Sequence, residues 1–520
     1  MSTRSRAAED TLSLQAGERR ALRPRAACYH AHGRGSSGKA WRRSSRNLNV
    51  RGLGATARPD THTGAGRRYT LDNISRRDFI QKSTGAAAGL AAAGSLLAFG
   101  REAMAQGEEL RVAVLGINGR GGSHIGAFTR IEGSRVVALC DPDETLFESR
   151  AAAVTNAGYP KPKFYPDIRD LLEDDEIDAI SIATPNHWHC LATIWGCQAG
   201  KDVYVEKPLS WGIWEGRQAV KAARKYGRIV QVGTQRRSDG RFRDAVARYR
   251  RGDVGTPVMA RATCYKPRPS IGYQPVEDPP ATLHWDVWKG PGPDVPFHRN
   301  LVHYNWHWFY DFGNGDLGNQ GVHQMDVARW GIDKALPVHV SSTGGRLGYD
   351  DQAETPNTQT CSFQYDDGTM LVFEVRGLPT AEESGGRIGN QFYGSEGWMS
   401  ENDGFQAHIG YNGEVQEFDG PLPPVGGAGA DDHFANFVKA VRSRRVEDLN
   451  ADVLEGHYSA ALCHLGMISH RLGRALEFDP EKEEFVGDDE ANSMLRRPFG
   501  GVTRSGSGLR TRAFEVPDVV

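Results

Sequence analysis

Cysteine is scarce in this chain, with 7 residues among 520. The seven form no CxxC pair and no closely spaced framework of the kind that holds small secreted domains together. Cys28 stands apart near the amino end. We expect most of the others to be buried thiols, with at most one disulfide in an oxidising compartment: Cys140, Cys190, Cys197, Cys264, Cys361 and Cys463.

The chain also lacks a strongly apolar run of the ~20 residues needed to span a bilayer. The best candidate, Ser83 to Phe99, is diluted by glycine, serine and threonine. A mean hydropathy of −0.53 and a hydrophobic fraction of 39% fit a globular protein with room for two or three domains. No permanent membrane anchor is therefore expected.

Acidic residues outnumber basic ones after residue 105, although the beginning of the chain is basic. Residues 1–70 carry 15 Lys and Arg against 4 acids, and residues 71–105 carry four against three. The net charge of −2 therefore leaves −14 for residues 106–520. Because nucleic-acid binding depends on Lys and Arg contacts with phosphate, we expect no nucleic-acid partner for this acidic part.

An export signal is present well inside the chain. SRRDFIQK (75–82) has paired arginines, a modest apolar segment follows, and Ala103-Met104-Ala105 forms a small-x-small cleavage site. Residues 71–105 therefore predict a twin-arginine signal peptide that engages the Tat translocase and is cleaved between Ala105 and Gln106. The expected localisation is periplasmic, or otherwise exported by that pathway.

The arginine-rich residues 1–70 show no helical or strand periodicity. Export signals normally stand at the amino terminus. We therefore interpret this segment as disordered, or as upstream sequence translated from a start codon assigned too early. A nucleic-acid-binding arm is the less favoured alternative.

From Leu110 short apolar runs alternate with helical segments, as in βαβ units. LRVAVLG (110–116) predicts the first strand, GINGRGGSHIG (116–126) the turn into a helix, and RVVALCD (135–141) a second strand that ends on an acid. This order matches the dinucleotide fingerprint of a doubly wound parallel sheet, although Asn118 replaces its middle glycine. Pyrophosphate would bind at the helix N-terminus.

Asp141 lies 25 residues after Gly116, where the fingerprint has an acid for the adenosine ribose. A carboxylate there would repel a 2′-phosphate, and Pro142-Asp143 supplies no arginine. We therefore expect NAD rather than NADP. A turn-capping aspartate is the alternative interpretation.

Further strands are predicted at AISIA (179–183), VYV (203–205) and IVQVG (229–233). Ligands of such sheets bind at the carboxyl ends of the strands, where TPNHWH (184–189) and EKP (206–208) fall. The predicted cofactor-binding residues are Gly116, Asn118, Gly119, Arg120, Gly121, Asp141, Thr184, Pro185, Asn186, His189, Glu206 and Lys207.

In this order GxNGRG, TPNHWH and EKP resemble the Gfo/Idh/MocA oxidoreductase family, typified by glucose–fructose oxidoreductase. HWDVWKGPGP (284–293) and NWHWFYDFGNGDLGNQGVHQMDVARWG (305–331) carry the same resemblance. It implies an N-terminal Rossmann domain followed by an α/β domain with a large, mostly antiparallel sheet. That sheet would face the nicotinamide and build a homo-oligomer interface.

The resemblance also implies catalytic positions. The family lysine of EKP falls on Lys207, its D-x-G-x-H histidine on His323, and its aspartate on Asn319, which cannot titrate. Alcohol oxidation needs a base, which suits histidine, and a cation to stabilise developing oxyanion charge, which suits lysine. Asp316 and Asp326 are candidates to replace the missing carboxylate, and the Lys207–Pro208 bond is a candidate cis peptide.

The aromatic and histidine-rich stretch from His298 to Trp308 allows two interpretations. His303 and His307 have HxxxH spacing, but no HExxH glutamate accompanies them and the region looks like a loop. We therefore predict a carbohydrate pocket rather than a metal site, with Trp306, His307 and Asp316 as substrate residues. Tyr265, Lys266 and Arg268 are weaker candidates for the same pocket.

The predicted domains are a Rossmann domain at 106–234, a substrate and oligomerisation domain at 235–475 and an extended tail with one short helix at 476–520. Helices are predicted at 431–445 and 451–474, closing the second domain or packing on the first sheet.

The function expected from these residues is NAD(P)-dependent oxidation of a sugar or glycoside CH–OH group by a tightly held nicotinamide. The alternatives are an NAD-dependent glycoside hydrolase or lyase acting by transient oxidation and elimination, and a non-catalytic sugar-binding protein.

Overall fold

The computed structural model describes residues 108–383, 386–418, 420–427, 429, 432–497, 514–518 and 520. The predicted extension 1–70 and export signal 71–105 lie outside the described residues. Within the described part, no helix is both long and apolar enough to cross a membrane. The six cysteines of this part are buried and carry free thiols.

The first sheet is parallel and has the strand order β3-β2-β1-β4-β5-β6. This is the doubly wound arrangement that the alternating pattern predicted. Its strands are β1 (Leu110–Leu115), β2 (Ser134–Cys140), β3 (Lys163–Tyr165), β4 (Ala179–Ile182), β5 (Asp202–Val205) and β6 (Val230–Val232).

Helices cover both faces of this sheet, which explains why its central strands are apolar on both sides. One face packs against α4, α5 and α6, and the other against α2, α3 and α11. The helices are α2 (Arg120–Arg130), α3 (Phe147–Thr155), α4 (Ile168–Leu171), α5 (Asn186–Gln198), α6 (Ile213–Lys225) and α11 (His433–Ser443), and a short 3-10 helix η2 (Glu144–Leu146) precedes α3.

The second sheet has ten strands in the order β14-β13-β12-β11-β7-β10-β9-β8-β15-β16. All neighbours are antiparallel except β7 and β10, so the prediction of a large, mostly antiparallel sheet is confirmed. Its strands are β7 (Pro257–Cys264), β8 (His339–Gly345), β9 (Thr358–Gln364), β10 (Met370–Arg376), β11 (Ile388–Gly394), β12 (Gly397–Ser400), β13 (Ala407–Ile409), β14 (Glu414–Gln416), β15 (Leu476–Asp479) and β16 (Glu484–Phe485).

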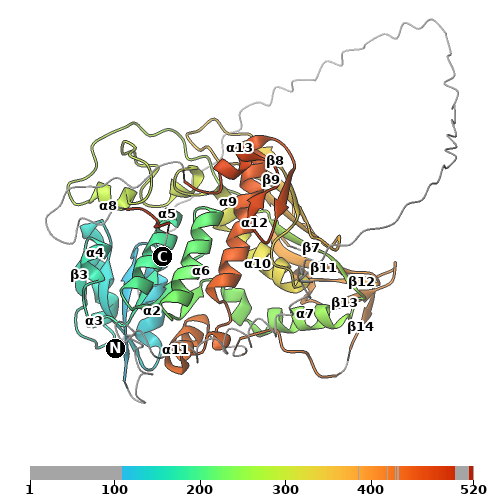
Figure 1. Ribbon diagram of the computed structural model, residues 1–520, viewed down its shortest axis with the longest axis horizontal. Coiled ribbons are helices and arrows are strands. Elements are labelled where there is room, and N and C mark those ends of the chain that lie inside the picture. The colour runs from blue at the N-terminus through green and yellow to red at the C-terminus, as the bar shows by residue number, and fades with distance from the viewer. Residues whose placement is uncertain are drawn as a thin grey trace, which may run out of the picture. The chain divides into compact units, whose positions relative to one another are not determined.

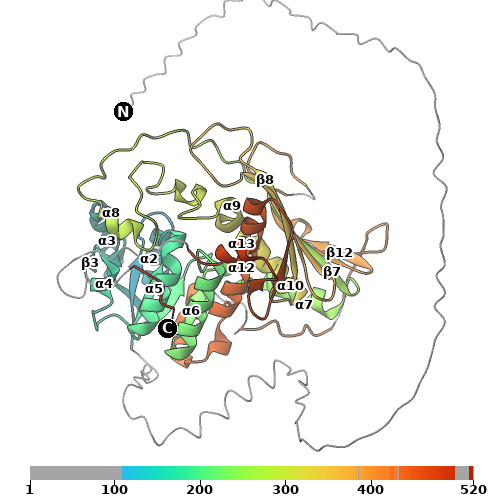
Figure 2. The same ribbon diagram turned by 45° about the horizontal axis from the view of Figure 1, so that its top comes forward.

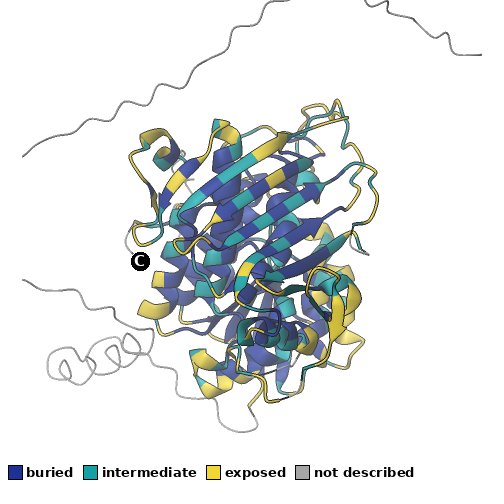
Figure 3. Ribbon diagram, turned by 90° about the vertical axis from the view of Figure 1, so that its right-hand side faces the viewer, coloured by how far each residue is buried: buried dark blue, intermediate teal, exposed yellow. Residues whose placement is uncertain are grey.

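One face of the large sheet is covered and the other is partly open. Along β10 every second residue is buried, and Figure 3 shows the same alternation on the neighbouring strands. The buried side chains form a core with α7, α10 and α12. The remaining helices are α7 (Gly240–Arg251), α8 (Trp285–Lys289), α9 (Gly315–Asn319), α10 (Gly321–Ile332), α12 (Val453–Leu472) and α13 (Asp489–Ser493), with 3-10 helices η3 (Gln235–Ser238), η4 (Asn305–Trp308), η5 (Glu401–Asp403) and η6 (Val446–Asp448).

Helix α12 contributes to the cores of both sheets. Figures 1 and 2 show it between α6 and the large sheet, and it contributes Ala460 to the core on the first sheet and Ala461 to the core on the second. The two predicted C-terminal helices therefore pack against different parts of the structure. Helix α11 packs on the first sheet, whereas α12 contacts both.

The segment from residue 476 differs from the extended tail that we predicted. Its first residues form β15 and β16 at one edge of the large sheet, and α13 follows. The cause is a set of apolar residues, Leu476, Phe478 and Phe485, which are buried against that sheet. Strands of four and two residues are too short to give a clear pattern in the sequence.

Candidate active site

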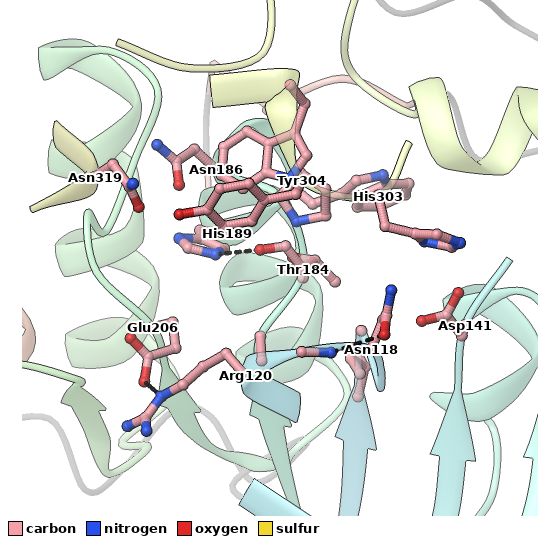
Figure 4. A pocket seen from close by; sticks show the side chains of 18 of the residues that line it. Asn118, Arg120, Asp141, Thr184, Asn186, His189, Glu206, His303, Tyr304 and Asn319 are labelled. Carbon is pink, nitrogen blue, oxygen red and sulfur yellow. Dashed lines mark hydrogen bonds and ion pairs between the residues drawn. The ribbon is translucent and has the colours of Figure 1, made fainter. Parts of the chain in front are cut away.

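A cavity of about 570 Å³ opens at the carboxyl ends of β1, β2, β4 and β5. The loop after β7 reaches this edge, because Glu144 N donates to Thr282 O and His284 N donates to Pro142 O. Figure 4 shows the labelled side chains around the cavity. The predicted site residues that line it are Gly116, Asn118, Gly119, Arg120, Asp141, Thr184, Pro185, Asn186, His189, Glu206, Lys207, Trp306, Asn319 and His323.

The turn after β1 requires glycine at its first position. Gly116 has φ 75°, and a Cβ there would lie 2.6 Å from the backbone nitrogen of Thr184. A Cβ on Gly121 would lie 1.9 Å from the Gly116 oxygen, so Gly121 permits close packing but does not line the cavity. Asn118, the departure from the fingerprint, accepts a 2.9 Å hydrogen bond from Gly119 N and supports the turn itself.

Asp141 is held at the end of β2 by backbone amides. Its carboxylate accepts hydrogen bonds from Ile117 N at 2.9 Å and Asp143 N at 3.0 Å. Burial nevertheless raises the pKa of Asp141 to about 6, with the two amides and His303 acting in the opposite direction. The side chain lines the cavity, as the ribose interpretation requires.

Glu206 is a buried anion with several donors around it. Its Oε1 accepts from Arg120 Nε at 2.8 Å and from Gln235 Nε2 at 3.1 Å, and it lies 3.1 Å from His124 Nε2. Burial opposes ionisation, but His124 and Arg120 outweigh it and hold the pKa of Glu206 well below its usual range. A Cβ on Gly233 would lie 3.0 Å from this carboxylate, so glycine makes room for it.

His189 ties two strand ends together. Its Nδ1 lies 2.6 Å from the Pro208 oxygen and its Nε2 lies 2.8 Å from the Thr184 oxygen. Burial lowers the pKa of His189, so the neutral ring donates its single N–H to one of these two carbonyls, and the ring lies between the ends of β4 and β5.

Lys207 extends from the end of β5 toward α9. Its Nζ donates to the Asn319 backbone oxygen at 2.5 Å, and the Lys207–Pro208 peptide bond is cis. Burial and the nearby Arg120 lower the pKa of Lys207, while Glu206 raises it. Because the Asn319 contact uses the backbone carbonyl, it does not depend on whether position 319 is aspartate or asparagine.

His323 lies in the first turn of α10 and faces the same cavity. Burial, followed by the Lys207 cation, lowers the pKa of His323 to about 3. The imidazole is therefore neutral near pH 7. Lys207 and His323 compete for positive charge, which is the coupling expected of neighbouring proton-transfer groups.

Two predicted substrate residues do not line the cavity. Asp316 is completely buried and pairs with Arg268, at 2.9 Å from Nε and 2.8 Å from Nη2. His307 is also buried, with Nδ1 2.7 Å from the Tyr304 oxygen. Arg268, Tyr304 and Trp306 stand at the cavity wall in their place.

Asp326 does not replace the missing carboxylate either. It pairs with Arg237 inside the protein, at 2.8 Å from Nε, and it does not line the cavity. Of the two histidines with HxxxH spacing, His303 contacts Asp143 through Nε2 at 3.0 Å and His307 contacts the Tyr304 oxygen through Nδ1. Among the described residues no cluster of three or more His, Cys, Asp or Glu side chains could hold a metal ion.

Several residues that line the cavity were not predicted from the sequence. Gln235 follows the end of β6, so the strand-end rule that located EKP could have found it too. Trp188 belongs to the TPNHWH motif but was not among the predicted site residues. Trp288, His303, Tyr304 and Gln320 come from loops or helix starts whose position the sequence pattern does not determine.

Two buried polar side-chain atoms without hydrogen-bond partners in the described part of the chain also indicate that the cavity binds a polar ligand such as a dinucleotide. The hydroxyl of Thr184 and the side-chain nitrogen of Asn186 are buried, line the cavity and have no hydrogen-bond partner within the described structure. Buried polar atoms are rarely left unpaired, so a polar ligand group is expected against them. Together with the N-terminus of α2, where the helix dipole favours an anion, they fit the ribose and phosphate parts of NAD.

Two family models match the chain. Residues 110–234 match "Oxidoreductase family, NAD-binding Rossmann fold", and residues 270–503 match "Oxidoreductase family, C-terminal alpha/beta domain". Both belong to the Gfo/Idh/MocA set, and together they cover more than half of the chain.

Curated relatives match a shorter stretch. A glycosyl hydrolase family 109 protein of Shewanella baltica is 29% identical over 174 residues, which is 30% of this chain and 38% of that protein. The uncharacterized oxidoreductase YrbE of Bacillus subtilis is 30% identical over 162 residues, which is 31% of this chain and 46% of that protein. The matched part is thus less than half the length of these relatives.

Solved structures share the fold. The WlbA dehydrogenase from Bordetella pertussis, in complex with NADH and UDP-GlcNAcA, is 20% identical with a TM-score of 0.54, covering 72% of this chain and 99% of that one. Levoglucosan dehydrogenase, in complex with NADH and levoglucosan, is 16% identical with a TM-score of 0.54, covering 71% and 99%.

Proposed function

We propose that this chain, which belongs to the Gfo/Idh/MocA oxidoreductase family and has its NAD-binding Rossmann fold, oxidises a CH–OH group of a sugar or glycoside. One observation carries the proposal: Lys207, just after β5, and His323, on α10, line the same cavity as Gly116 and Asp141. The groups suited to move a proton thus share one cavity with the residues suited to bind a dinucleotide.

We assign His323, Lys207 and Glu206 different roles in this reaction, according to their charge states. Bound NAD would accept the hydride of the CH–OH carbon. His323, neutral near pH 7, has an unprotonated ring nitrogen to receive the hydroxyl proton. Lys207, held by the Asn319 oxygen, would stabilise the developing negative charge on the substrate oxygen. Glu206 would stay ionised beside them and favour the charged form of Lys207.

The test uses the purified protein with the nicotinamide that it retains. Sugars and glycosides are added singly while the absorbance of reduced nicotinamide is followed. A lasting rise with one compound identifies the substrate class. Retained nicotinamide with neither a rise nor an altered sugar across the panel would contradict the proposal.

A second candidate is glycoside cleavage through transient oxidation and elimination. The curated relatives named glycosyl hydrolase family 109 proteins favour it. In that cycle the cofactor returns to its starting state, so absorbance would show no lasting change while a free sugar appears. Chromatography of the same reactions separates the two candidates.

We also propose export by the Tat route, with cleavage after Ala105, and assembly into a homo-oligomer. A nicotinamide that stays bound through the cycle suits an exported enzyme, since free NAD is scarce outside the cytoplasm. Residue-level sequencing of the mature amino terminus from the periplasm tests the first proposal. Light scattering of the purified protein tests the second.

Cofactor choice should depend on pH through Asp141. Its pKa of about 6 makes it largely ionised at pH 7.5 and largely protonated at pH 5. Only the ionised form repels a 2′-phosphate, so we expect the preference for NAD over NADP to be at least about tenfold larger at pH 7.5 than at pH 5. Titrations of both cofactors by fluorescence measure the ratio.

The control for this prediction is Asp141→Asn, which keeps the shape but cannot ionise. Asp143 and His303 face the same carboxylate and remain in that variant. The variant should therefore show little cofactor preference and little change between the two pH values. A pH-dependent preference that persists in Asp141→Asn would assign the effect to His303 and contradict the prediction.

A further inference from the structure

The wall of the cavity beyond Lys207 is built by the segment after β7. Lys266 and Arg268 follow the end of that strand and line the cavity together with Tyr304 and Trp306. These residues come from the substrate side of the fold, away from the glycine turn. Their charges therefore bear on the substrate rather than on the pyrophosphate.

The cavity has acids at its nucleotide part but none on this wall. Its lining carboxylates are Asp141 and Glu206. Asp141 stands at the end of β2, and Glu206 is already bound by Arg120 and Gln235. Neither is available to neutralise a cation on the substrate wall.

Arg268 is held in place by a buried carboxylate, that of Asp316. Asp316 receives its Nε and Nη2 and is completely buried behind it, while Nη1 contacts the Tyr304 hydroxyl at 3.3 Å. This pairing balances the charge of Arg268, yet it leaves N–H capacity on Nη1. The guanidinium is thus oriented as a hydrogen-bond donor at the wall.

Lys266 is different, because its ammonium has no carboxylate within the described part of the chain to pair with. It is exposed, so water solvates it in the absence of substrate. With Lys207 assigned to the reacting oxygen, Lys266 supplies one uncompensated positive charge. One charge matches a carboxylate, whereas a phosphate group carries about −1.5 to −2 near pH 7.

We propose that the substrate is an acidic sugar, a uronic acid or its glycoside, whose carboxylate pairs with Lys266 and accepts a hydrogen bond from Arg268 Nη1. This inference rests on the proposed function, since it names the substrate class for the same site. Charge-assisted hydrogen bonds of this kind are about twice as strong as neutral ones and would orient the ring over the catalytic pair.

The experiment compares uronic acids with the neutral sugars of the same ring configuration. Binding to the NAD-loaded protein is measured by calorimetry, and turnover is measured separately. We expect uronates to bind about 10- to 100-fold more tightly than their neutral parents. Lys266→Met should remove that difference, and Lys266→Glu should reverse it.

Lys221→Met, an exposed lysine of α6, is the matched control and should change nothing. Uronates that bind no better than neutral sugars, or a preference unchanged in Lys266→Met, would overturn the inference. A preference for sugar phosphates over uronates would overturn it as well. Failure of the proposed function looks different, because uronates would then bind through Lys266 without any hydride transfer or change in the sugar.

Discussion

Replacing Lys207 with methionine is expected to lower kcat by about 10²- to 10³-fold, the range typical for loss of one group that stabilises negative charge on the reacting oxygen. Methionine keeps most of the volume and removes the charge. The substrate oxygen would then lose the cation that stabilises its negative charge. Stopped-flow absorbance of the reduced nicotinamide measures the step directly.

The fold around Lys207 should survive this change. Its ammonium is bound to one neutral acceptor, the Asn319 oxygen, so no buried carboxylate loses its partner. We expect NAD to remain bound. The amount of NAD released per protein on denaturation measures this. Lys221→Met is again the control. A Lys207→Met protein with unchanged turnover would remove Lys207 from the mechanism.

The largest effect on stability is expected at Arg497. Its guanidinium pairs with Glu215 through Nε and, at 2.8 Å, through Nη2, and both side chains are at most 5% exposed. It also donates to the His187 oxygen at 2.7 Å and the Pro291 oxygen at 3.0 Å. One side chain thus joins α6, the start of α5 and the loop after α8.

Arg497→Met would leave the Glu215 carboxylate buried without its partner. Breaking a buried pair in this way costs about 3–5 kcal/mol. We expect the midpoint of thermal unfolding to fall by at least about 5 °C. The Kd for NAD should also rise, because Asn186 and Trp188, next to the displaced His187 carbonyl, line the cavity.

The neighbour Arg496 provides a matched control. Its side chain is 43% exposed and pairs with Asp518 at 2.6 Å, so Arg496→Met should change the midpoint little. The double variant Glu215→Gln, Arg497→Met should be more stable than Arg497→Met alone, since no bare carboxylate is buried. Equal midpoints for Arg496→Met and Arg497→Met would contradict the assigned role.

The nucleotide part of the site was largely predictable because its signals are local. A strand, a glycine turn and an acid at the next strand end fix Gly116 and Asp141 within 26 residues, and parallel strands bring their ends to one edge. The same rule placed Lys207. Their catalytic and binding roles stay predictions, but their common cavity follows from the fold.

The substrate wall was not predictable in the same way. Asp316 and His307 were chosen from their neighbours in sequence, yet Asp316 turns inward to Arg268, 48 residues earlier. Arg497 and Glu215 are 282 residues apart. Such pairs depend on how loops and helices far apart in the sequence pack, and no periodicity in a single sequence carries that information.

The late position of α11 and of residues 514–516 has a consequence for biosynthesis. Phe434 and Phe437 cover one face of the first sheet, and Phe514 packs against Trp188 and Trp195 of α5 on the other. A nascent chain that has emerged only as far as β6 therefore contains α2 to α6 but lacks the later part of the cover on each face. We therefore expect full NAD affinity only once α11 has been made, and an affinity tag fused near residue 514 to disturb α5, whose first residues line the cavity.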